Sequence, residues 1–226
     1  METKWIIAIA FIAILIFYFY PVSGRESSVN AEVTVVYKDG STETFTGNPL
    51  DNLFKKVFQA ITLPGDTRQV DRFIIKLFFQ PYFTGTVTQW DFKAEASVWL
   101  FYDTGDEEML EAKTFTDSGS SLANGQRVDV GSFIVMASTI EQKLNNRNAQ
   151  EGEYALILKL KYARLSVTFD TGVSDSYEIT PASPINIFTL NFNYTGDKID
   201  RVDVGGDFSV SFTSLVKPVE EVMPWT

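Results

Sequence analysis

The clearest hydrophobic pattern after the first thirty residues is an alternation of apolar and polar positions. Val33, Val35 and Tyr37 occupy every second position of one run. The pair Asp39-Gly40 follows, and a second run ends at Phe45. An Asp-Gly pair between two alternating runs is a strong local signal for a β-hairpin. The pattern therefore predicts two antiparallel strands here.

Two later segments have the spacing of amphipathic helices, in which apolar residues recur every three or four positions. The first lies between Asn48-Pro49 and Pro64-Gly65, and its apolar residues are Leu50, Leu53, Phe54, Val57, Phe58 and Ile61. The second begins at Ser132, and its apolar residues are Phe133, Met136, Ala137, Ile140 and Leu144. We expect two short helices that cover a core. The polar stretch 145–148 that follows is the best candidate for a domain boundary.

Most of the remaining chain repeats with period two, which is the spacing of half-buried strands. One long example runs through Trp90, Phe92, Ala94, Ala96, Val98 and Leu100. The expected fold class is all-β, with one or two antiparallel, jelly-roll-like sandwiches, two short helices and an N-terminal hydrophobic helix. We expect a β-rich domain over 25–150. Residues 151–226 form either a second sandwich domain or the second half of one large sandwich.

Short internal similarities run through this β-rich part. Arg-Val-Asp-Val-Gly occurs at 127–131 and again at 201–205. An aromatic residue followed by a tight turn with Gly occurs three times, at 37–40, 102–105 and 169–172. Two interpretations are open: a duplicated or triplicated β unit, or turns that any β protein uses. The spacings are too uneven for a solenoid of fixed period.

The first part of the chain has a different character. Residues 5–20 contain no charged side chain and no side-chain amide. This segment is longer than the hydrophobic core of a typical signal peptide and shorter than a typical transmembrane helix. Small residues near Gly24 and Ala31 would suit cleavage. We favour a retained transmembrane anchor over 1–24, because Trp5 and the Phe17–Tyr20 run place aromatic rings at both ends. The bilayer would then be a partner through residues 5–22, with the amino terminus inside and the bulk of the chain outside the cytoplasm.

The amino-acid composition limits the reactions that the side chains can catalyse. The 226 residues include no Cys and no His, and the formal net charge is −10. A nucleic-acid partner is disfavoured by that charge. Without His or Cys, most nucleophilic and acid–base arrangements are absent, so we expect no enzyme and no cofactor. The S-x-x-K spacing at Ser214 to Lys217 ends a predicted strand instead of opening a helix, and it carries little weight.

Two acidic loops are candidates for Ca²⁺, although neither has the EF-hand pattern. Their residues are Asp103, Asp106, Glu107 and Glu108 in one loop, and Asp197, Asp200, Asp203 and Asp207 in the other. Charged loops are more often simply solvated, so the metal assignment stays unknown.

The interface candidates come from two strands. Val33, Val35 and Tyr37 lie in a clean alternating strand directly after the tether, which favours a position at a sheet edge that accepts a neighbouring strand. Trp99 and Phe101 lie opposite the buried face of their strand, where aromatic side chains serve a second buried face, a protein interface or a sugar platform.

The expected function is a membrane-tethered extracytoplasmic structural or assembly protein, such as a surface appendage or envelope subunit or a viral coat or spike component. It would contact copies of itself or other surface proteins. The alternative is a carbohydrate-binding β-sandwich module.

Overall fold

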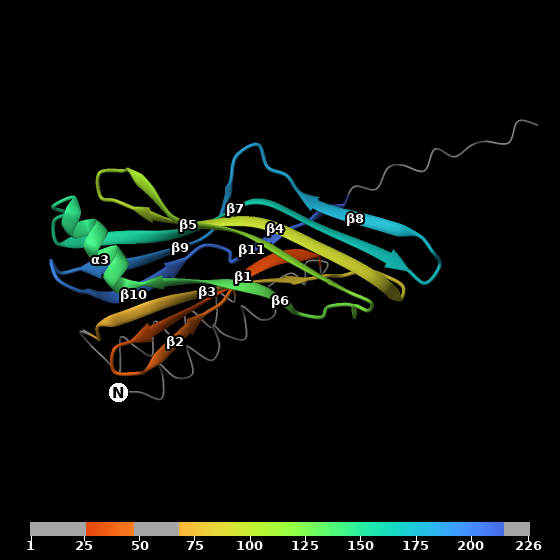
Figure 1. Cartoon of the computed structure of the whole chain (residues 1–226), viewed down its shortest axis with the longest axis horizontal. Coiled ribbons are helices and arrows are strands. Elements are labelled where there is room, and N and C mark those ends of the chain that lie inside the picture. The colour runs from red at the N-terminus through yellow and green to blue at the C-terminus, as the bar shows by residue number, and fades with distance from the viewer. Residues whose placement is uncertain (1–25, 48–67, 215–226) are drawn as a thin grey trace, which may run out of the picture.

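The computed structural model describes residues 26–47 and 68–214, which form two antiparallel β-sheets and one helix (Figure 1). The five-stranded sheet contains β1 (Ser28–Tyr37), β2 (Thr42–Phe45), β3 (Val70–Gln80), β6 (Val128–Met136) and β11 (Ser209–Ser211). The seven-stranded sheet contains β4 (Val87–Phe101), β5 (Glu107–Gly119), β7 (Gly152–Phe169), β8 (Ser174–Ile179), β9 (Ile185–Tyr194), β10 (Ile199–Gly205) and β12 (Thr213–Ser214). The all-β antiparallel sandwich is confirmed. The hydrophobic segment 1–24 and the predicted helix over 50–61 lie outside the described residues.

Strand order follows from the pairing. The path through the five-stranded sheet is β11-β1-β3-β6, with β2 also paired to β1. The path through the seven-stranded sheet is β10-β9-β7-β4-β5, with β8 paired to β7 and β12 to β8. The long β4–β7 pair joins a strand from before the polar stretch 145–148 to one from after it, from Phe101↔Ala155 to Val87↔Phe169. Segments 25–150 and 151–226 therefore share one sheet.

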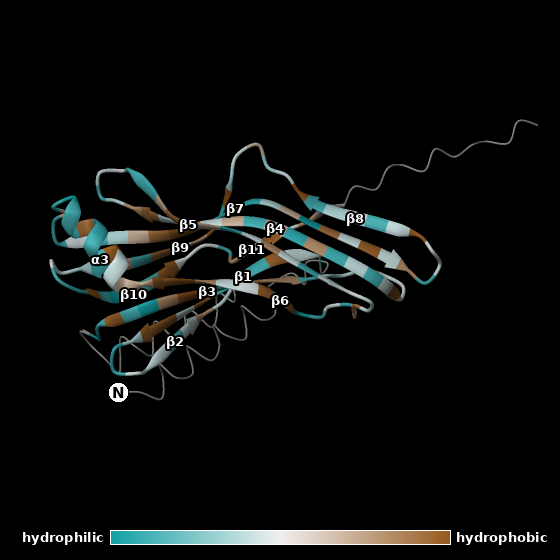
Figure 2. Cartoon of the chain, viewed as in Figure 1, coloured by the Kyte–Doolittle hydropathy of each residue, from teal (hydrophilic) through white to brown (hydrophobic). Residues whose placement is uncertain are grey.

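The core lies between the two sheets, and hydrophobic and hydrophilic residues alternate along the long strands (Figure 2). Phe73 and Phe79 of β3 and Phe92 of β4 are fully buried. The Phe79 and Phe92 rings stack with their centres 4.5 Å apart. Each large apolar side chain buried this way contributes about 1.5–3 kcal/mol. Figure 2 shows the same striping along β3, β4 and β7, as expected for sheets with one buried face.

The second predicted helix begins later than the sequence pattern suggests. Residues 128–136 form β6, which pairs with β3 from Phe79↔Val128 to Arg72↔Met136. The helix, α3, spans Ala137–Asn146 and buries Ala137, Ile140 and Leu144. The start at Ser132 was wrong because Phe133 and Val135 also satisfy period two, and the free edge of β3 supplies the backbone partners that a strand needs. In the part of the chain that the structure describes, no helix is long and apolar enough to cross a bilayer.

The edge position predicted for β1 is wrong. β1 pairs with β3 along its whole length, and β11 and β2 take its other side. Val33, Val35 and Tyr37 point into the core, with exposed fractions of 0%, 0% and 4%. β1 is thus an interior strand, because β3 covers the side that the β1–β2 hairpin leaves open, and β11 pairs with the first residues of β1 on the same side as β2.

The three similar turns have the same backbone geometry. In each, the aromatic residue donates its N–H to the residue four positions later, at 2.9 Å for Tyr37 and Tyr102 and 2.8 Å for Phe169. The glycine donates back to the carbonyl of that aromatic residue, with φ between +79° and +87° at Gly40, Gly105 and Gly172. Such positive φ values favour glycine. These three hairpins therefore share one turn type.

The two Arg-Val-Asp-Val-Gly segments both lie at sheet edges, one in β6 and one in β10. Each contains a β-bulge, at Val130 in β6 and at Arg201-Val202 in β10. Bulges are common in edge strands and interrupt their pairing surface. The two segments occupy the edges of opposite sheets, and whether the two halves superimpose as units stays a prediction.

Candidate functional site

Trp99 and Phe101 lie on the outer face of the seven-stranded sheet, as their alternation with Val98 and Leu100 predicts. Both are half-buried. Trp99 stands directly opposite Met109 of β5 and Ile157 of β7. Met109 is 51% exposed, whereas Ile157 is 6% exposed. The outer face therefore carries a short apolar strip across three strands.

The Trp99 ring is held in place by its neighbours. The Lys159 Nζ atom lies 4.8 Å from the ring centre, and Lys159 also pairs with Glu107. The indole Nε1 donates a hydrogen bond to Ser97 Oγ at 2.8 Å. A cation over a ring face is favourable, so this face of Trp99 is already occupied. The strip is not a bare aromatic platform.

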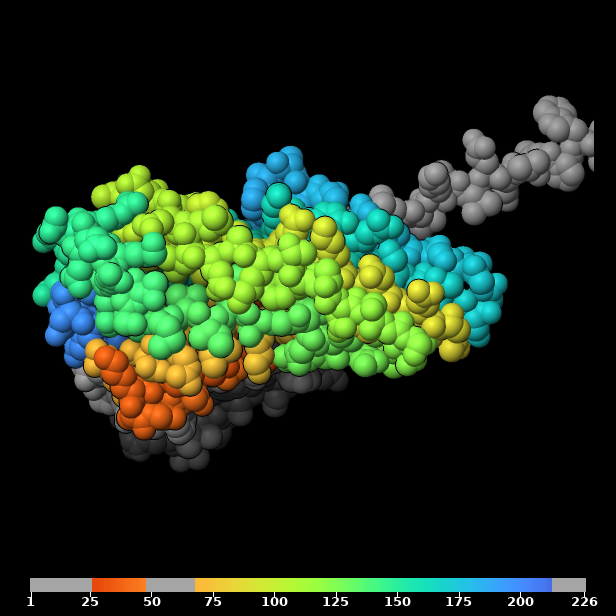
Figure 3. Space-filling model, viewed as in Figure 1, coloured from red at the N-terminus to blue at the C-terminus, as the bar shows by residue number. Residues whose placement is uncertain are grey.

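A hollow of about 340 Å³ lies beside the strip, and we call it the outer groove. Its floor carries the small side chains of Ser97, Ala112 and Thr114. Trp99 and Met109 bound one end, and Pro184 lies in the loop before β9. In Figure 3 the yellow-green residues of β5 and the blue loop before β9 stand on either side of this region.

The other end of the outer groove is charged. Glu95 accepts a hydrogen bond from Lys161 Nζ at 3.2 Å, and Lys93 Nζ lies 3.5 Å from its other oxygen. The hydrogen bond and the positive charge of Lys161 lower the pKa of Glu95 below its ordinary value. The Glu95 carboxylate is therefore an ionised acceptor at neutral pH. The Lys161 side chain is 70% exposed and keeps donors free for other contacts.

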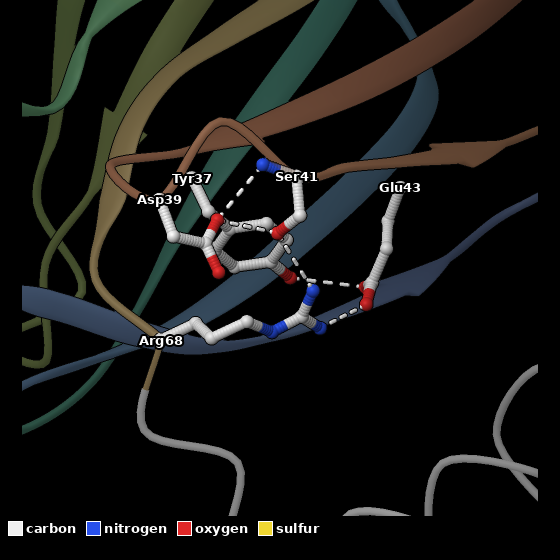
Figure 4. A network of polar contacts seen from close by, with 5 residues as sticks. All are labelled: Tyr37, Asp39, Ser41, Glu43 and Arg68. Atoms are coloured by element: carbon white, nitrogen blue, oxygen red, sulfur yellow. Dashed lines mark hydrogen bonds and ion pairs between the residues drawn. The ribbon is translucent and has the colours of Figure 1, made fainter.

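A cluster of polar residues closes the β1–β2 hairpin (Figure 4). Tyr37 donates its hydroxyl to Glu43 at 2.9 Å, and Arg68 pairs with the same carboxylate. The Arg68 guanidinium lies 4.0 Å from the centre of the Tyr37 ring and also donates to Ser41 Oγ at 3.0 Å. Asp39 accepts from the Ser41 backbone N–H at 2.8 Å.

A second cluster repeats this arrangement at the β4–β5 hairpin. Tyr102 donates its hydroxyl to Glu108 at 2.6 Å, and the Arg147 guanidinium lies 4.0 Å from the centre of the Tyr102 ring. Arg147 Nη2 lies 3.4 Å from Glu108, and Lys143 pairs with the same carboxylate. In both hairpins the Glu follows the Tyr by six residues. We call each Tyr–Glu–Arg set a clasp.

The clasps have a structural role. Each Arg lies on the connection that leads to the next strand, Arg68 just before β3 and Arg147 just before β7. Each therefore ties the residues just before a strand to the tip of a hairpin from earlier in the chain. The turns can be predicted from the sequence, whereas the arginines cannot, because they lie 31 and 45 residues after their tyrosines. The Tyr-to-Glu spacing around a Gly turn was the available local signal.

The acidic loops do not assemble a metal site in the described part of the chain. Within it, no group of three or more His, Cys, Asp or Glu side chains is placed to hold a metal ion. Asp106 and Glu108 pair with Arg147. Asp200 is 2% exposed and accepts a hydrogen bond from Asn193 Nδ2 at 2.9 Å. Lys217 of the S-x-x-K spacing lies outside the described residues.

Comparison with known proteins identifies no relative: no protein-family model, no curated protein and no solved structure matches the chain.

Replacing Arg147 tests the clasp. We expect Arg147→Met to lower the free energy of unfolding by about 1–2 kcal/mol, because the stacking and the charge-assisted contacts to Glu108 are lost together. Arg164→Met is the matched control: Arg164 is similarly exposed and pairs with Glu178 at 3.6 Å. Urea unfolding measures both variants. Equal losses would show that the stacked geometry adds nothing to an ordinary surface pair.

The clasp also predicts a pH dependence. Hydrogen bonds from Lys143 and Tyr102 lower the pKa of Glu108 below its ordinary 4.5. The contribution of Glu108 to the free energy of unfolding is therefore present above pH 4.5 and is lost as the pH falls further. Burial and the hydrogen bond to Glu108 raise the pKa of Tyr102 from 10.0 to about 12. The contribution of Tyr102 to the free energy of unfolding is therefore lost as the pH rises through that interval.

Unfolding free energies measured from acid to alkaline pH check this. Glu108→Gln should reduce the loss of stability at acid pH, and Tyr102→Phe should reduce the loss of stability at alkaline pH. We call these two parts of the stability curve its acid limb and its alkaline limb. Glu153→Gln, at an exposed position, is the control and should leave both limbs unchanged. A Glu108→Gln variant with the acid limb of the parent would contradict the assignment.

Proposed function

We propose that the chain is a membrane-tethered, extracytoplasmic structural protein that works in a surface assembly, such as an appendage, an envelope layer or a virion coat. The observation that carries this proposal is the uncharged segment 5–20, with aromatic residues at both ends, directly before a folded β-sandwich. Residues 21–27 alone separate the segment from β1, and they span at most about 25 Å when extended. The sandwich would therefore stand close to the membrane surface.

The sandwich itself suits a structural role. It contains no Cys, so its stability outside the cytoplasm rests on its apolar core and on the clasps that hold its long connections. Many charged side chains of the described residues pair with one another, as Lys159 of β7 does with Glu107 of β5. This arrangement supports rigidity more than catalysis.

An apolar patch supports contact with a second copy. Ile134 and Met136 of β6 are 55% and 39% exposed on the outer face of the five-stranded sheet, and Ile74 of β3 lies opposite Ile134. We call these three residues the β6 patch. Exposed apolar groups of this kind at a sheet edge favour association. A tether would hold copies in one plane and raise their local concentration, so a second copy is the partner we propose.

Charges placed inside the hydrophobic segment test the tether. We expect Ile12→Arg with Leu15→Arg to release the chain from membranes during alkaline extraction, because each Arg near the centre of a span costs about 2.5–3.5 kcal/mol. Thr116→Arg, on the exposed surface of β5, should leave the chain in the membrane fraction. Intact mass of the mature protein should include Met1. A mature chain beginning near Arg25 or Glu32 would contradict retention.

The β6 patch is tested by oligomeric state. The full chain in detergent should form oligomers by light scattering, and Ile134→Lys should shift it toward monomer. Val173→Lys is the matched control, since Val173 is 58% exposed at the β7–β8 turn. Raising the salt from about 0.05 to about 0.5 M should strengthen association, because it screens the repulsion between acidic copies. A wild-type chain that is monomeric both in detergent and in membranes would overturn self-association.

A further inference from the structure

The outward-facing side chains of the outer groove belong neither to the core nor to the clasps. Glu95, Ser97 and Trp99 project outward from β4, opposite Thr114, Ala112 and Met109 of β5. Directly opposite residues share one face of a sheet. Small side chains in the middle and larger ones at both ends make the floor concave. The groove is therefore a consequence of which residues occupy the outward positions.

We propose that the outer groove binds a neutral saccharide, with one hexopyranose ring seated between Trp99 and Glu95. The ring of such a sugar has apolar C–H groups on its faces and hydroxyls around its rim. The groove offers an apolar end, at Trp99 and Met109, and a polar end, at Glu95 and Lys161. A binding site of about 300–1,000 Å³ is usual for small ligands, and about 340 Å³ suits a single ring with an open side for a longer chain.

The apolar end is organised before any ligand arrives. Trp99 is fixed by the Lys159 cation on one ring face and by its hydrogen bond to Ser97, so binding does not have to order the indole. Ordering a free side chain costs about 0.5–1.5 kcal/mol on binding. Met109 is 51% exposed beside it and adapts its shape to the ligand.

The polar end matches the rim of a sugar. The ionised Glu95 carboxylate accepts hydrogen bonds from hydroxyls, and the exposed Lys161 ammonium donates to them. Thr114 adds a hydroxyl that both donates and accepts. Both signs of charge are present in the groove, and the whole chain carries −10, so an anionic sugar has no net attraction to this surface.

This inference is independent of the proposed membrane assembly. The groove lies on the seven-stranded sheet, whereas the β6 patch lies on the five-stranded sheet. Variants in one surface leave the other intact, so failure of sugar binding and failure of self-association are separate results.

The test uses the full chain in a detergent without a sugar headgroup. The probes are the methyl pyranosides of glucose, galactose, mannose and N-acetylglucosamine, and the readout is saturation-transfer NMR with titration. We expect at least one probe to bind with a dissociation constant of about 1 mM. Ala112→Trp fills the middle of the groove and should weaken that binding at least tenfold.

Thr116→Trp is the matched control, because Thr116 is exposed on the same face of β5 two positions beyond Thr114. It should bind the probe as the wild type does. Glu95→Gln provides a second variant that keeps the shape of the groove, and we expect a loss of about fivefold because a charged acceptor is replaced by a neutral one. The proposal is overturned if none of the four probes binds, or if Ala112→Trp and Glu95→Gln both bind as tightly as Thr116→Trp.

Discussion

Two sheets in this molecule must bury their inner faces against each other, because the chain has no Cys to staple them. The contact of β3 with β4 is part of this burial: the centre of the Phe79 ring lies 4.5 Å from that of Phe92 and 5.5 Å from that of Trp90. A few such aromatic side chains, at about 1.5–3 kcal/mol each, match the whole net stability of a typical domain. The hairpin tips and the outward-facing surfaces are carried by the strands that this apolar layer holds together.

The clasps act where the apolar layer ends. A hairpin tip and a long connection have little apolar surface to bury, so local polar contacts decide whether they stay in place. Tyr37 and Tyr102 each keep the ring against an Arg and the hydroxyl on a Glu, which satisfies the phenol without exposing the ring. The third turn, at Phe169, has the same backbone bonds with a side chain that has no hydroxyl, so the turn geometry does not depend on the clasp.

The outward faces of the two sheets differ, and this difference separates the two proposed surfaces. The β6 patch is apolar and close to a sheet edge, as expected for contact with a large, flat partner. The outer groove mixes a fixed indole with an ion pair and a floor of small side chains, which suits a small polar ligand. A rigid sandwich lets both surfaces exist without competing for the same residues.

Local periodicity determined a large part of this structure. Alternation identified β1 and β4 and the inward positions of Val33 and Phe92, because side-chain direction in a strand depends only on residue parity. The three Gly turns were also predictable from a few neighbouring residues. Strand partners were not local: β1 became an interior strand because β3 took the side that its hairpin partner β2 leaves open, and β11, about 180 residues after β1, paired with its first residues. The same limit applies to β6, whose backbone pairs with β3, and to Arg68 and Arg147, whose tyrosines are far away in the chain. The outer groove required the register of β4 with β5, which sets Ala112 opposite Ser97. Side-chain direction is encoded residue by residue, whereas strand order and register are settled by which arrangement buries the apolar faces of the whole chain together.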